Sequence, residues 1–84
     1  MDTVTFVKAV INSQHGWAVA DQFETTYNDP TPDVFAERNQ NAMDYVKQTV
    51  EEILDSGLFV EEVEDGLRYY LIAMETACQF WENK

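Results

Sequence analysis

The segment from Thr31 to Asp55 constrains the fold most, because its two faces differ sharply along one helical period. At about 100° per residue, its apolar residues fall on a single stripe. That stripe consists of Phe35, Ala42, Val46, Val50 and Ile53. Thr31 and Pro32 are typical of an N-cap and a first helical position, and Gly57 is typical of a helix end. The sequence therefore predicts one long helix over residues 32–55.

A polar run from Arg38 to Asn41 interrupts this segment. One alternative is that the run ends one helix and that Asn41 caps another. The apolar face and the acidic face both keep their phase across the interruption, which favours a single helix bent at this point.

Carboxylates occupy a narrow arc on the opposite face of the segment: Asp33, Glu37, Asp44, Glu51 and Asp55. In a continuous helix rising ~1.5 Å per residue, they would extend over roughly 33 Å in steps of about 6 and 10 Å. This spacing brackets the ~6–7 Å between successive phosphates of a nucleic-acid strand. Lys47 flanks the row without belonging to it, and the row lacks the regular cationic partners of a salt-bridged surface helix.

Three further helices are predicted over residues 3–14, 17–28 and 60–82. Asp2 or Thr3 caps the first, Gly16 ends it, and two prolines at 30 and 32 break the chain after the second. The prediction is an all-α fold, a small irregular four-helix bundle in a single acidic domain over residues 1–84. Its predicted core comprises Trp17, Phe23, Phe35, Val46, Val50, Ile53, Leu67, Tyr70, Leu71, Met74 and Trp81.

Two segments also have a β alternative. The β-branched residues of 3–11 suit a strand as well as a helix. Asp65 and Gly66 are a recognised turn signal, so an α+β fold with a β-hairpin at about 58–72 competes with the last helix. Helical spacing from Phe59 to Trp81 favours the helix.

The net charge of −11, from 16 acidic and five basic residues, constrains the class of partner. Such a field repels nucleic acid and anionic membranes and attracts basic surfaces. The partner expected is therefore a basic, nucleic-acid-binding protein, with no direct contact to nucleic acid or membrane. The sequence shows no signal peptide and no run of ~20 apolar residues, which predicts a cytoplasmic protein, in the host cytoplasm if a virus encodes it.

Catalytic and metal-binding patterns are missing from the sequence. His15 and Cys78 are the only histidine and the only cysteine, whereas a zinc site needs three or four such ligands. Phosphate-loop, dinucleotide-binding and serine-hydrolase motifs are absent. We expect no enzymatic activity, no cofactor and no metal.

The acidic faces carry the leading functional hypothesis. In size, charge and helicity the chain is similar to the small acidic inhibitors that phages and mobile elements aim at CRISPR effectors, restriction enzymes or repair enzymes. It would act as a partial DNA or RNA mimic, with anti-CRISPR or antirestriction activity. The partner-binding residues would be the five carboxylates of the long helix together with Glu61, Glu64 and Asp65 of the last helix.

The alternative hypothesis is a small helical interaction module or subunit, whose acidity is incidental. It would bind its partner through apolar surface around Leu58, Tyr69 and Phe80. Tyr69 and Phe80 widen the apolar arc of the last helix beyond what one neighbouring helix covers, so they are also candidates for a homodimer interface.

Overall fold

The computed structural model describes residues 2–57 and 59–82, without the side chains of residues 81 and 82, and these ranges contain five helices and no strand. The helices are α1 (Thr3–His15), α2 (Trp17–Asn28), α3 (Pro32–Ala36), α4 (Gln40–Ser56) and α5 (Glu61–Glu82). The predicted all-α bundle is confirmed. The strand alternative for 3–11 is wrong, because this segment lies within α1.

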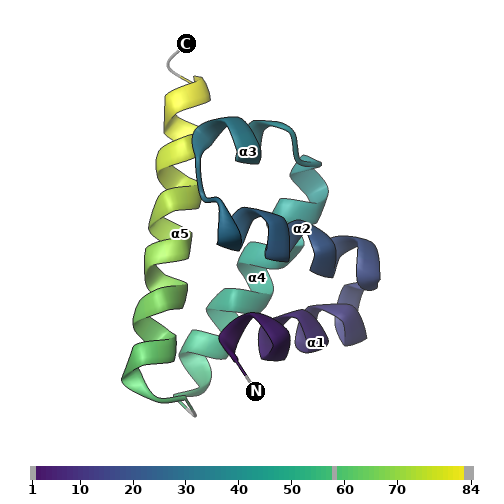
Figure 1. Ribbon diagram of the computed structural model, residues 1–84, viewed down its shortest axis with the longest axis vertical. Coiled ribbons are helices and arrows are strands. Elements are labelled where there is room, and N and C mark those ends of the chain that lie inside the picture. The colour runs from purple at the N-terminus through teal and green to yellow at the C-terminus, as the bar shows by residue number, and fades with distance from the viewer. Residues whose placement is uncertain (1, 58, 83–84) are drawn as a thin grey trace.

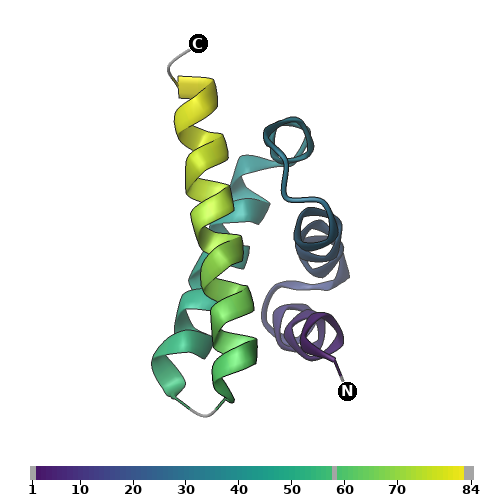
Figure 2. The ribbon, with the colours of Figure 1, turned by 60° about the vertical axis from the view of Figure 1, so that its left-hand side comes forward.

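The helices form two layers. α4 and α5 are an antiparallel pair that starts close together at their connection and diverges toward the other end (Figure 1). α1, α2 and α3 lie across this pair, and Figure 2 shows them stacked one above another and nearly end-on beside α5.

Local signals set most of the helix ends. The Thr5 backbone N–H donates to Asp2 Oδ1 at 2.8 Å, which caps α1 and lowers the pKa of the Asp2 carboxyl. Gly16 separates α1 from α2 at φ +96°, and Gly57 ends α4 at φ +67°. Both angles lie where a side chain is disfavoured, so glycine permits each sharp change of direction.

The predicted helix over 32–55 is wrong in one respect, because it is divided into α3 and α4. The Arg38 N–H donates to the Phe35 carbonyl, only three residues back, at 3.1 Å, which closes the last turn of α3. Asn39 is extended, and its side-chain oxygen accepts from the Ala42 N–H at 3.1 Å. The residue that caps α4 is therefore Asn39 and not Asn41.

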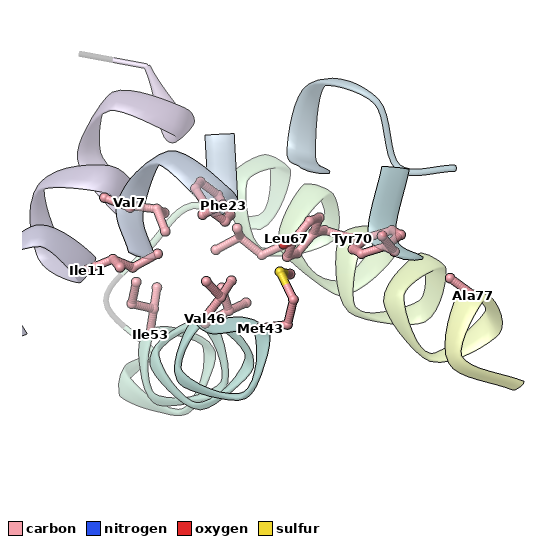
Figure 3. Close-up of a cluster of buried hydrophobic side chains, with 12 residues drawn as sticks. Val7, Ile11, Phe23, Met43, Val46, Ile53, Leu67, Tyr70 and Ala77 are labelled. Atoms are coloured by element: carbon pink, nitrogen blue, oxygen red, sulfur yellow. The ribbon is translucent and has the colours of Figure 1, made fainter. Parts of the chain in front are cut away.

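The core lies between the two layers (Figure 3). Seven of the predicted core residues are buried: Phe23, Phe35, Val46, Val50, Ile53, Leu67 and Tyr70. Leu71 and Met74 are half-buried against them. Trp17 contradicts the prediction, since its side chain is 76% exposed at the first position of α2. The side chain of Trp81 lies outside the described residues.

Tyr70 joins the layers at the centre of α5. Its ring lies 5.2 Å from that of Phe23, 5.7 Å from that of Tyr27 and 6.0 Å from that of Phe35, measured between centroids. Its hydroxyl lies 2.6 Å from that of Thr26 on α2. Burial raises the pKa of the Tyr70 hydroxyl.

The β-hairpin alternative at about 58–72 is also wrong, because residues 61–72 are part of α5; Leu58 lies outside the described residues. Gly66 serves helix packing instead of a turn. A Cβ at this position would come within 3.0 Å of the Tyr27 hydroxyl oxygen. The glycine thus lets α2 and α5 approach closely.

Candidate functional site

The exposed face of α4 carries three of the five carboxylates of the predicted acidic row. Helical spacing aligns Asp44, Glu51 and Asp55 on the side opposite the buried residues Val46, Val50 and Ile53. At ~1.5 Å per residue, the three carboxylates extend over about 16 Å of the helix. Because they stand on one rigid element, their relative positions are set by the helix and not by a loop.

These three carboxylates keep their charge uncompensated at short range. Among the described residues, none of them lies within ion-pair distance of a lysine or arginine, although Lys47 is on the flank of the row. Asp44 accepts one hydrogen bond, from Gln40 Nε2 at 3.3 Å. An approaching cation would therefore meet carboxylates that need not first break an internal salt bridge.

The beginning of α5 adds further negative charge close to Asp55, because the short connection from α4 places the two helix ends side by side (Figures 1 and 2). Glu61, one of the predicted partner-binding residues, is exposed in the first turn of α5. Glu64 and Asp65 differ, because both pair with Arg68, at 3.7 Å and 3.1 Å respectively. They remain acidic but are already partly neutralised.

Asp33 and Glu37 do not belong to the row on α4, which corrects the predicted five-carboxylate row of roughly 33 Å. Asp33 is exposed on α3, and Glu37 is the C-cap of that helix, with its Oε2 3.4 Å from Arg38 Nη2. Because the backbone changes direction between Glu37 and Asn39, these two side chains do not continue the line of Asp44.

Two exposed carboxylates absent from the prediction belong to the same acidic surface. Glu52 lies beside Glu51 on α4, and Glu62 follows Glu61 in the first turn of α5. Each of them stands next to another glutamate in the sequence, and neighbouring residues of a helix point in different directions. A prediction limited to a narrow arc therefore included only one glutamate of each pair. We define the acidic surface as Asp44, Glu51, Glu52, Asp55, Glu61 and Glu62.

A second candidate surface lies on the outer face of α5. Tyr69 and Phe80 are 67% and 50% exposed, as expected for residues beyond the reach of the core. Ile72, which was not predicted, is 62% exposed, and helical spacing places it on the same side.

Within the described part of the chain, no group of three or more His, Cys, Asp or Glu side chains has the geometry to hold a metal ion. None of its helices is long and apolar enough to cross a membrane. Comparison with known proteins found no matching family model, no matching curated protein and no matching solved structure.

Proposed function

We propose that this protein is a non-catalytic inhibitor that binds a basic, nucleic-acid-binding protein through the acidic surface. The observation that supports this proposal is the row of Asp44, Glu51 and Asp55, exposed on one rigid helix without a cationic partner among the described residues. The partner would be a CRISPR effector, a restriction enzyme or a repair enzyme, met in the cytoplasm, or in the host cytoplasm if a virus encodes this chain.

The mechanism is electrostatic and steric. The carboxylates would take the positions of phosphates against arginine and lysine side chains of the partner, and the bundle would exclude the nucleic acid by its volume. A net charge of −11 speeds encounter with a basic surface and makes the association sensitive to salt. Like charges held in a row repel one another in the unbound protein, and a basic partner relieves that repulsion.

The test is a pull-down from bacterial lysate with the tagged protein at low ionic strength. The column is eluted in steps of rising salt and, in parallel, with excess duplex DNA. The proposal expects release of one discrete nucleic-acid-binding protein by DNA. Recovery of scattered basic proteins, all lost at moderate salt, would contradict it.

A matched pair of variants then tests the row itself. Asp44→Asn, Glu51→Gln and Asp55→Asn together should weaken partner binding strongly while the circular dichroism spectrum stays helical. The control removes three charges elsewhere, by Asp21→Asn, Asp29→Asn and Asp33→Asn, all at exposed residues outside α4. Equal binding by the two triple variants would show that the row is an ordinary solvated helix face with no specific role in partner binding.

The exposed side chains of Tyr69, Ile72 and Phe80 favour a second candidate, a helical interaction module that binds through apolar surface. Salt separates the two candidates, because charge mimicry weakens steeply as ionic strength rises whereas apolar docking persists. Light scattering at high protein concentration tests the homodimer that the same face would form.

A further inference from the structure

A groove of about 980 Å³ lies between the first half of α4 and the second half of α5, where the two helices have diverged. Its floor is apolar. Phe35, Met43 and Ala77 are buried there, and Leu71 and Met74 are half-buried. Figure 3 shows the Met43 side chain directed from α4 toward α5. Residues of α4 and α5 form two walls of the groove, and Phe35 and Ala36 of α3 also line it.

Methionine is concentrated at this groove. The chain has three methionines, and two of them, Met43 and Met74, line it. An unbranched, polarisable thioether adapts to differently shaped apolar groups, and surfaces that accept amphipathic helices use it for this reason. The methionine-rich lining therefore suits a row of apolar side chains better than one small rigid molecule.

The charged residues of the groove indicate the chemistry of its occupant. Asp44 and Glu51 on α4 and Glu75 on α5 are exposed carboxylates of the lining, which also includes the cations Arg38 and Lys47. The carboxylates stand on both helical walls, so a row of side chains lying between the walls would have negative charge on each flank. The strongly negative field of the whole chain adds to this preference for a basic occupant.

Arg38 lines the groove from the link between α3 and α4. Its side chain is only 18% exposed, and its buried Nε has no hydrogen-bond acceptor among the described residues. A buried donor without an acceptor is costly. Because that Nε is itself inaccessible from the groove, the binding of an occupant rests on the apolar floor and the carboxylates.

We propose that the groove binds an amphipathic helix of a partner protein, with an apolar stripe flanked by lysine or arginine. The stripe packs on Met43, Leu71 and Met74, and the flanking cations lie against the carboxylates of the two walls. This proposal extends beyond charge mimicry, because such a helix can belong to a partner that binds no nucleic acid.

The test uses the whole protein with [13C]methyl-labelled methionine and three synthetic peptides. The first peptide has leucine and lysine at amphipathic helical spacing, the second has glutamate in place of every lysine, and the third is the first with its order scrambled. The proposal expects the methyl signals of Met43 and Met74, assigned with Met43→Leu and Met74→Leu, to shift with the first peptide only. No shift with it, or equal shifts with either of the others, would overturn the proposal.

Substitutions at the groove provide the second readout. Met74→Lys places a cation on the floor and should weaken the first peptide by about tenfold, as for a central interface residue. Glu75→Lys should weaken it more than Asp21→Lys, which makes the same charge change at an exposed residue of α2 that does not line the groove. Equal weakening by these two variants would show attraction to net charge alone and would overturn the proposal. The peptide result is independent of elution by DNA, so either proposal can fail without the other.

Discussion

The hydroxyl oxygens of Thr26 on α2 and Tyr70 on α5 lie 2.6 Å apart, and both side chains are buried. Thr26 Oγ1 also lies 2.8 Å from the carbonyl oxygen of Gln22 and donates its one hydrogen to it. The Tyr70 hydroxyl is therefore the donor between the two side chains. The bond ties the two layers of the bundle together.

This direction of donation predicts unequal costs for the two matched variants. Thr26→Val leaves the buried Tyr70 hydroxyl without an acceptor and should cost about 1–3 kcal/mol of unfolding free energy, whereas Tyr70→Phe should cost about 1 kcal/mol. The double variant should cost less than the sum, because the second change removes the orphaned donor. Urea unfolding of the four proteins measures the cycle. A larger cost for Tyr70→Phe than for Thr26→Val would reverse the assigned direction.

The raised pKa of Tyr70 predicts a loss of stability in alkali. Its pKa in the unfolded chain is near 10.0, and burial raises the pKa in the folded state. The stability that Tyr70 provides is thus fully present below pH about 10, and it falls above that pH because only the unfolded state releases the proton. The slope approaches about 1.4 kcal/mol per pH unit. The advantage of the parent over Tyr70→Phe should shrink between pH about 9.5 and about 11, and a constant advantage would contradict the assignment.

The break before α4 predicts a position-specific effect of two neighbouring asparagines. Asn39→Ala removes the cap that accepts from the Ala42 N–H and should cost about 1 kcal/mol. Asn41→Ala changes an exposed position inside α4 and should be neutral or slightly stabilising, since alanine has the higher helix propensity. Thermal unfolding of both variants distinguishes the observed cap from the alternative at Asn41, which would exchange the two results.

Exposure predicts that two aromatic residues of α2 differ strongly in their importance. Phe23 is fully buried, and Phe23→Ala should cost about 3–5 kcal/mol. Trp17→Ala should change the unfolding free energy by no more than about 0.5 kcal/mol. Chemical denaturation of both variants provides the measurement. A severe loss from Trp17→Ala would contradict the exposed position of this side chain.

Most helices could be predicted because their signals are local. Asp2, Gly16, the two prolines and Gly57 mark ends that the structure retains, and the apolar spacing of α4 and α5 matches their buried faces. The division at residues 37–39 has no proline or glycine to announce it. Phe35 lies seven residues before Ala42, which suits a continuous helix, but its ring packs on Tyr70 of α5. The apolar spacing alone therefore cannot distinguish one continuous helix from two helices. The packing of Phe35 against α5 belongs to the tertiary structure, and it accompanies two helices.

The candidate site, too, could be predicted from the sequence only in part. The exposure of Asp44, Glu51 and Asp55 follows from helical phase, so the sequence suffices to place them. The separation of Asp33 and Glu37 from that row depends on the break, and the groove beside Met43 and Met74 depends on how far α4 diverges from α5. The spacing of residues along one helix determines neither the position of the break nor the divergence of the two helices.

The short α3 also divides the chain into two parts that could be prepared separately. A five-residue helix has too few hydrogen bonds to persist alone, so residues 29–39 depend on the packing of Phe35. Expression of residues 1–38 and 39–84 as two separate chains would yield one fragment with α1 to α3 and another with α4 and α5. Because the buried face of each fragment is completed by the other, the two pieces should recombine into the intact bundle. Such a split pair would serve as a reporter that regains its structure only when its halves meet.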